Sequence, residues 1–392
     1  MAFRRAHSMW SVAACSSATC FAVPVLSARK APPEPCACAE KQKSTSVRIM
    51  TFNVQFYIQF SRVLAELGKF KIRYGPFSHA GLVKSLDGAA LEELANKHDL
   101  DSFKNRPAVK GNFDAICEFM QAQRPDIVAI QEGIKGMDIF VEDTSDAAGY
   151  RLQASASADG QTCRIPKGGT MVNQVLLNVA NPSLAKVSSW QLQTKPQNFE
   201  LDGDCARCAA GLRVSIRGQL LDIVSIHLTG GRYDDKHWKM FRSQRWDEIR
   251  RVIDSKFDPE VPMLILGDFN AQSTEGEVNE GYGRSLGATS DEEMAIFKEY
   301  MVGVHNKLQE LGWKPAYTKS DLPIPSSVFG GTVDWVYKSP NWPDSLHIVG
   351  VDVLDVIHAS DAPWASYPAG GSLKLSLSDH NPVVFDIELR GT

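Results

Sequence analysis

Short apolar runs, several of them ending in a polar residue, recur along most of the chain. Runs of this length and composition are typical of buried β-strands. The expected strands span residues 47–53, 126–131, 171–179, 187–192, 212–217, 221–227, 261–266, 332–337 and 381–389. The tight connection at Gly218-Gln219 joins two of them and predicts a β-hairpin.

Three other segments carry apolar residues at helical spacing. Residues 111–124 repeat apolar side chains every three or four positions and stop before Pro125. Residues 236–253 and 292–311 form longer amphipathic patterns. Helices placed between buried strands are typical of layered folds, in which helices cover the outer faces of sheets. The pattern therefore predicts an α/β fold whose sheets pack face to face.

Four of the expected strands end in polar residues. Asn53, Glu132 and His227 follow three of the apolar runs, and Asp268 and Asn270 follow a fourth. In layered folds the ends of strands commonly face the crevice where ligands bind. Each residue alone is also compatible with a turn or a helix start, but their conjunction favours one shared polar site.

The residue types at these positions indicate a particular chemistry. Hard oxygen donors suited to Mg²⁺ are supplied by Glu132, Asp268, Asn270 and Asp379. Three of these are acids, which would repel one another without a cation. His227 and His380 titrate near neutral pH, and Asp334 or Asp379 could orient a histidine. This set predicts hydrolysis of a phosphoester by water activated at a metal ion.

Composition and charge narrow the function only slightly. The chain has 392 residues, with 42 Lys and Arg against 46 Asp and Glu, and a net charge of −4. This balance argues against a protein whose affinity comes mainly from neutralising nucleic-acid phosphates. Beyond the N-terminus no strongly apolar run is long enough to predict a membrane span. The length suits one large catalytic domain, which we expect to be monomeric.

The N-terminal region differs from the rest of the chain. Arg4 and Arg5 precede an uncharged stretch over residues 9–26, and small residues follow it. These features are typical of a secretory signal peptide, while the Ser-rich, acid-poor composition also fits an organelle transit peptide or a disordered tail. We expect residues 1–45 to be a targeting segment plus linker in a secreted or organelle-targeted protein. Residues 46–392 then form the catalytic domain.

Three cysteines leave alternatives open. Cys205 and Cys208 form a CxxC motif, which is a weak zinc signal without a second such motif. A disulfide from Cys163 to one of this pair is plausible in an oxidising compartment, and free thiols in a surface loop are equally compatible.

Six sequence blocks resemble the endonuclease/exonuclease/phosphatase superfamily and follow its order. They are TFN at 51–53, IQE at 130–132, SIHL at 225–228, LGDFNA at 266–271, TVDW at 332–335 and SDHNP at 378–382. Members of this superfamily include DNase I, neutral sphingomyelinases, deadenylases and inositol-polyphosphate 5-phosphatases. The resemblance covers residues 47–389 and implies a four-layered α/β sandwich, with two packed mixed β-sheets flanked by helices.

The same resemblance implies ligands for metal and phosphate. In such proteins the counterpart of Glu132 binds Mg²⁺, with Mn²⁺ as an alternative ion. The counterpart of Asn53 helps to hold metal or phosphate, and that of Asp379 lies beside the metal. A tyrosine that contacts the phosphate in this family has no clear match, and Asn173 or its neighbour is the nearest candidate.

Catalytic roles are implied in the same way. The counterpart of Asp268 positions or deprotonates the attacking water, and that of Asn270 contacts the phosphate. The counterpart of His380, oriented by that of Asp334, stabilises the developing charge or assists proton transfer. His227 matches a second histidine of the DNase I and sphingomyelinase branches.

The substrate is left open by these residues. The expected partner is a phosphodiester in a nucleic acid, a lipid or a small molecule. The alternatives are a DNase I-type nuclease, a sphingomyelinase-like lipid phosphodiesterase and a catalytically inactive binding module. Arg232 could contact a phosphate as a bidentate donor or remain solvated. Residues 57–106, 272–301 and 339–374 resemble insertions, and aromatic residues of the last could stack on bases, contact lipid or pack against the domain.

Overall fold

The chain divides into two compact units, Met1–Lys43 and Ser44–Thr392. The computed structural model describes only residues of the second unit, namely 45–54, 107–147, 149–162, 170–196, 206–230, 238–272, 278, 280, 284, 288–327, 331–356, 378 and 380–390. The expected targeting segment and the expected insertion at 57–106 therefore lie outside the described residues.

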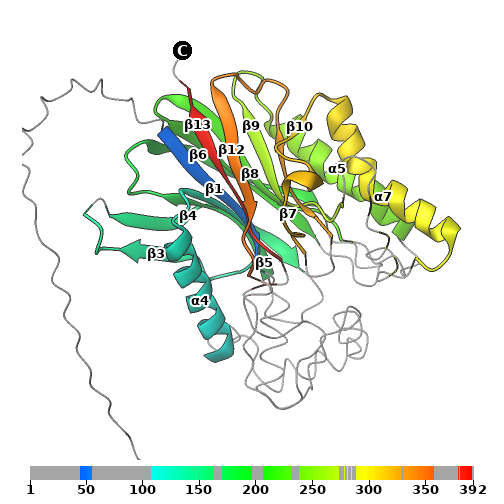
Figure 1. Ribbon diagram of the computed structural model, residues 1–392, viewed down its shortest axis with the longest axis horizontal. Helices are drawn as coiled ribbons and strands as arrows, with labels where there is room; N and C mark the ends of the chain where they lie inside the picture. The colour runs from blue at the N-terminus through cyan, green and yellow to red at the C-terminus, as the bar shows by residue number, and fades with distance from the viewer. Residues whose placement is uncertain are drawn as a thin grey trace, which may run out of the picture. The chain divides into compact units, whose positions relative to one another are not determined.

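The first sheet has seven strands in the order β12-β13-β1-β2-β5-β4-β3 (Figure 1). They are β1 (Thr45–Asn53), β2 (Ile127–Ile134), β3 (Phe140–Asp143), β4 (Tyr150–Thr162), β5 (Thr170–Asn178), β12 (Leu346–Val353) and β13 (Val383–Leu389). Strands β1 and β2 run parallel, with Asn53 opposite Gln131, while the remaining pairs are antiparallel. The C-terminal ends of β1 and β2 are therefore neighbours at the same end of the sheet.

The second sheet has six strands in the order β10-β11-β9-β8-β7-β6. They are β6 (Leu184–Lys195), β7 (Arg207–Ile216), β8 (Gln219–His227), β9 (Met263–Asp268), β10 (Lys314–Pro315) and β11 (Asp334–Lys338). Parallel pairing of β8 with β9 places His227 opposite Asp268, and antiparallel pairing of β11 with β9 places Asp334 opposite the same Asp268. Three candidate residues thus lie at one level on adjacent strands.

The two sheets pack face to face, with helices on the outer faces (Figure 1). The helices are α4 (Pro107–Gln123), α5 (Trp238–Lys256) and α7 (Asp291–Glu310), with a 3₁₀ turn η2 (Lys319–Asp321). Strand β1 shows the layering, because Val47 and Ile49 join the core between the sheets, whereas Met50 and Phe52 pack with residues of α4. Both faces of β1 therefore contribute apolar side chains to a core, although Ser46 and Arg48 near its start are exposed. The four-layered α/β sandwich is confirmed.

The predicted elements are all present in the structure. The three expected helices correspond to α4, α5 and α7, and the expected hairpin joins β7 to β8 through Arg217 and Gly218, both with positive φ. Strands β3, β4, β10 and β12 were not predicted. Strand β4 is rich in Ala, Ser and Gln, which are weak strand formers, and β12 lies in the segment interpreted as an insertion. Its pairing with β13 makes residues 346–353 part of the sheet. No helix among the described residues is long and apolar enough to cross a bilayer.

Candidate active site

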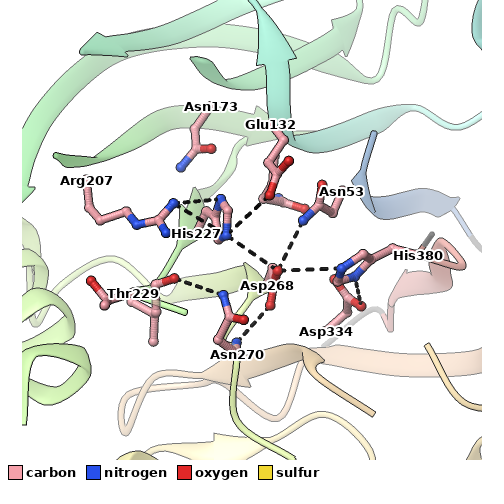
Figure 2. A network of polar contacts seen from close by, with 12 residues as sticks. Asn53, Glu132, Asn173, Arg207, His227, Thr229, Asp268, Asn270, Asp334 and His380 are labelled. Carbon is pink, nitrogen blue, oxygen red and sulfur yellow. Dashed lines mark hydrogen bonds and ion pairs between the residues drawn. The ribbon is translucent and has the colours of Figure 1, made fainter. Parts of the chain in front are cut away.

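Strand ends from both sheets converge at one end of the sandwich (Figure 2). Asn53 and Glu132 come from β1 and β2 of the first sheet, and His227, Asp268 and Asp334 come from β8, β9 and β11 of the second. All five side chains are at least nine-tenths buried. The sequence placed four of them at the ends of separate apolar runs and Asp334 within another expected strand, and the packing of the two sheets brings them together.

Asp268 lies at the centre of this cluster. Its Oδ2 accepts a hydrogen bond from Asn53 Nδ2 at 3.1 Å and lies 3.5 Å from His227 Nε2 and 3.8 Å from His380 Nε2. Its Oδ1 accepts the backbone N–H of Asn270 at 2.7 Å. Burial raises the pKa of Asp268 to about 6, although the charge of His380 opposes this shift. A carboxylate with such a pKa can take up a proton near neutral pH.

Close packing of β8 against β9 explains one glycine of the GDFNA block. Gly267 has φ +141, and a Cβ at this position would lie 2.0 Å from the carbonyl oxygen of Ile226. A side chain would therefore separate the two strands. Glycine lets His227 and Asp268 end their strands side by side.

His380 forms a dyad with Asp334. The Nδ1 of His380 lies 2.8 Å from Asp334 Oδ2, which fixes the imidazole plane and leaves Nε2 facing Asp268. The backbone of the histidine is also held, because its N–H donates to Ser378 Oγ at 3.1 Å, and that hydroxyl donates to the carbonyl of Asn53 at 2.6 Å. A carboxylate that orients an imidazole is a recurrent arrangement in hydrolytic sites.

His227 lies between two carboxylates and an arginine. Its Nε2 is 3.7 Å from Glu132 Oε1 and 3.5 Å from Asp268 Oδ2, and its Nδ1 is 3.2 Å from Arg207 Nη1. Burial lowers the pKa of His227 well below its ordinary range, and the charges of Arg207 and His380 add to this effect. Because arginine only donates, Nδ1 is the acceptor and the proton of the neutral ring is on Nε2, toward the carboxylates.

Arg207 is the main site residue that the sequence analysis missed. It begins β7 and is only 7% exposed, and its Nε has no hydrogen-bond partner among the described residues. The CxxC motif drew attention to the flanking cysteines instead. Cys208 is not in a surface loop, because it is buried in β7, where its Sγ donates to the carbonyl of Asp159, and burial raises its pKa to about 11. Cys163 and Cys205 lie outside the described residues.

Unusual backbone geometry directs two of the candidate side chains. Glu132 has φ 54 and lies where the pairing of β2 with β5 shifts register between Ile130 and Gly133. Such a bulge re-aims a side chain relative to a regular strand. Asn270 has φ 50, and its Nδ2 donates to the carbonyl of Leu228 at 2.9 Å. Non-glycine residues with positive φ often mark functional positions.

The remaining predicted residues are only partly placed. Asn173, on β5, is fully buried and donates from Nδ2 to the carbonyl of Cys208 at 2.8 Å, next to Arg207 (Figure 2). Within the described part of the chain its Oδ1 makes no hydrogen bond. Asp379 and Arg232 lie outside the described residues. The roles of all the candidate residues stay predictions.

The donor set fits a hard cation better than a soft one. Among the described residues, no three or more His, Cys, Asp or Glu side chains lie together in a way that could hold a metal ion. Mg²⁺ needs only one or two carboxylates and keeps several waters. Glu132, with the amide oxygen of Asn53, suits that requirement, and the predicted ligand Asp379 would add a second carboxylate.

Comparisons with known proteins give a family match and several similar solved structures. The sequence model of the Endonuclease/Exonuclease/phosphatase family matches residues 50–380. A solved endonuclease/exonuclease/phosphatase from Bacteroides vulgatus is 15% identical, with 88% of this chain and 100% of that chain covered and a TM-score of 0.43. The human Nocturnin catalytic domain with bound sulfate is 16% identical, with 88% and 94% covered and a TM-score of 0.45.

A mannosyl-6-phosphatase from Bacteroides thetaiotaomicron is 12% identical, with 87% of this chain and 99% of that chain covered and a TM-score of 0.43. A comparison with curated proteins gives no match. The family match extends over most of the chain, from β1 to His380, and includes every described candidate residue. The chain therefore belongs to the endonuclease/exonuclease/phosphatase family.

Proposed function

We propose that the protein is a Mg²⁺-dependent phosphoesterase that hydrolyses a phosphodiester by attack of an activated water on phosphorus. The observation that supports this best is the setting of Asp268, which is buried between Asn53 and two histidines with its pKa raised to about 6. Such a carboxylate can receive the proton of an attacking water at neutral pH. The family is generally hydrolytic, which agrees with this assignment.

Glu132 and Asn53 are the described residues that would hold the cation, and Asp379 is proposed as a further ligand. A bound Mg²⁺ would supply positive charge to a phosphate oxygen and lower the pKa of a bound water; Mn²⁺ could replace it. Asn53 also donates to Asp268 Oδ2. It therefore links the ligand set to the proposed base and fixes the orientation of that carboxylate.

Three groups are placed to bind or stabilise the phosphate. The His380 ring, held by Asp334, presents Nε2 toward Asp268 and can donate to an oxygen that gains charge. Asn270, next to the same aspartate, is proposed to contact the phosphate. Arg207 carries a buried Nε without a partner among the described residues, and its guanidinium can bind an anion with two parallel hydrogen bonds.

Other parts of the proposal rest on the sequence. Arg232 and Asn173 are proposed as additional substrate contacts, and residues 1–45 as a targeting segment that precedes a monomeric catalytic domain in a secreted or organelle-targeted protein. The substrate is proposed to be a nucleic acid, a lipid or a small phosphodiester. A DNase I-type nuclease and a sphingomyelinase-like enzyme are the specific alternatives, and an inactive binding module is the remaining one.

A substrate panel tests the proposal. Full-length protein is assayed with Mg²⁺ on bis-p-nitrophenyl phosphate, plasmid DNA, poly(A) RNA and sphingomyelin, with and without EDTA. We expect turnover of at least one substrate, loss of that turnover with EDTA, and a decrease of about 10²-fold in kcat for Glu132→Gln. Glu142→Gln, which changes an exposed glutamate on β3, is the matched control and should keep full activity.

Calorimetric titration with Mg²⁺ separates the alternatives. We expect the wild-type chain to bind the ion and Glu132→Gln to bind it weakly, while Glu142→Gln binds like wild type. Binding of Mg²⁺ without turnover of any substrate would instead support the inactive module. Undiminished activity in Asp268→Ala would overturn the assignment of the base.

A further inference from the structure

A buried polar network lies behind the turn that follows β8. Side chains of helix α5 form hydrogen bonds with the backbone N–H, the hydroxyl and the backbone carbonyl of Thr229. Its N–H donates to Glu248 Oε2 at 3.1 Å and its hydroxyl donates to Glu248 Oε1, while its carbonyl accepts from Arg245 Nε at 2.8 Å. Glu248 is 1% exposed and Arg245 is 2% exposed. These two residues are three positions apart, so they lie on the same face of α5.

Helix α7 supports this network from behind. Arg245 Nη2 donates to Tyr300 Oη at 2.6 Å, and the arginine Cζ lies 3.9 Å from the centre of the same aromatic ring. Buried charges are costly unless hydrogen bonds satisfy them. A network of this kind fixes the geometry of the segment that it binds, because each partner is itself fixed.

The segment that it binds leads directly to the candidate active site. Leu228 precedes Thr229, and its N–H donates to the carbonyl of Asp268 while its carbonyl accepts from Asn270 Nδ2, both at 2.9 Å. A Cβ at Gly230 would lie 3.0 Å from Asn270 Oδ1, so the turn also packs closely on that side chain. The position of Thr229 therefore constrains the position of the Asn270 amide.

Glu248 also interacts electrostatically with the site. Burial raises the pKa of Glu248, whereas the positive charge of Arg207, the hydrogen bonds from Thr229 and the charge of Lys195 favour the ionised form. Among its described hydrogen bonds, Arg207 contacts His227 and not a carboxylate.

We propose that Glu248 is a positioning residue of the active site: it fixes Thr229, and through the 227–230 turn it places the Asn270 amide. The inference rests on the proposed phosphoesterase function for its kinetic consequence, but not for the structural coupling itself. It extends the site from the strand ends to α5, a helix that contributes none of the candidate residues.

Kinetics of four variants test the coupling. Thr229→Val removes the hydroxyl with little change of shape, Thr229→Ser keeps it, and Glu248→Gln keeps an acceptor but removes the charge. We expect Thr229→Val and Glu248→Gln to lower kcat about tenfold, and Thr229→Ser to retain most of it. Asp222→Asn is the matched control, since Asp222 is a buried carboxylate, paired with Arg213, in the N-terminal half of β8. It should lower stability without lowering kcat.

A spectroscopic measurement tests the coupling without relying on activity. In full-length protein labelled with ¹⁵N-asparagine, the side-chain NH₂ signal of Asn270 is assigned by its loss in Asn270→Ser. We expect this signal to shift in Thr229→Val and Glu248→Gln and to stay unchanged in Asp222→Asn. An unshifted signal in both folded variants overturns the proposal, as does wild-type kcat in both. If wild-type protein hydrolyses no phosphoester, the proposed function fails, and the Asn270 signal alone then decides the positioning role.

Discussion

Two buried histidines, His380 and His305, lie near strand β11 and have different partners. Asp334 and Trp335 are consecutive on this strand, so their side chains point to opposite faces. His380 bonds the carboxylate of Asp334 at 2.8 Å. His305, which is on α7, packs edge-on against Trp335 with ring centres 5.0 Å apart, and its Nδ1 lies 2.7 Å from Tyr337 Oη.

The difference between these histidines lies in their surroundings, not in their burial. His380 has an ionisable partner in Asp334 and faces Asp268, so its ring lies within a polar cluster. His305 is enclosed by the rings of Phe269, Trp335 and Tyr337, and burial lowers its pKa to about 3. A buried histidine is therefore a candidate for catalysis only where charged or ligand-binding groups face it.

The largest effect should come from removing the histidine of the polar cluster. We expect His380→Ala to lower kcat about 10³-fold, because the site loses the donor that stabilises the developing charge, with little change in the melting temperature. His305→Gln is the matched control and should lower the melting temperature while kcat stays near wild type. Steady-state kinetics and thermal unfolding of both variants check this. Equal losses of kcat in the two variants would contradict the distinction.

The second effect concerns the partner that orients His380. We expect Asp334→Asn to lower kcat about 10²-fold, because an amide can hold the imidazole but cannot balance its positive charge. The variant should fold, since the amide fills the same volume. The comparison is with Asp222→Asn, which changes a buried carboxylate in the N-terminal half of β8, away from the site. If Asp334→Asn keeps wild-type kcat, the dyad has only a structural role.

The two regions also differ in how well the sequence predicted them. The polar residues around His380 were predicted because they lie at the ends of apolar runs or within short motif blocks of the sequence, as Asp268 and Asn270 do. What could not be predicted is their spatial arrangement. Arg207 comes from β7, the strand next to the edge strand of the second sheet, and the pairing of β7 with β8 brings it to the site. No local sequence pattern distinguishes it from a solvated arginine.

The fold was predicted from the same apolar runs, and strands without such a run were missed. Strands with continuous apolar runs, such as β2 and β9, are buried on both faces, which makes them recognisable from sequence alone. Strand β4 is not apolar enough to stand out, and its place depends on pairing with β5. The aromatic surroundings of His305 were not predicted either, because they combine α7, β11 and the segment after β9.

The third effect is a pH dependence of stability that originates at His305. Its pKa is about 3 in the folded protein, against an ordinary value of 6.5. Below pH 6.5 the unfolded chain binds a proton that the folded chain does not, so stability decreases as the pH falls toward 3. Between pH 7.5 and pH 5 this histidine should account for about 2 kcal/mol of the decrease in unfolding free energy. Urea unfolding at the two pH values measures it.

The control for this effect is the slope in His305→Gln. Other ionisable groups act on the wild-type slope as well, so only the difference between the two proteins reports on His305. The charge of Arg245 contributes to the low pKa of His305, while a backbone hydrogen bond at Ala271 opposes it. Parallel slopes in wild type and His305→Gln would mean that the ring is accessible to protons in the folded state.

The smallest effect should come from Tyr337→Phe, which removes only the hydroxyl that faces His305 Nδ1. Loss of the hydrogen bonds of this hydroxyl with His305 and Gln309 should lower the unfolding free energy by about 1–2 kcal/mol. The pH slope should persist, because the imidazole stays enclosed by aromatic rings, and kcat should not change, because the hydroxyl is on the opposite side of β11 from His380. A decrease in kcat comparable to that of Asp334→Asn would show that the aromatic residues around His305 are energetically coupled to the polar residues around His380. The comparison between the two histidines would then have to be drawn as one coupled network.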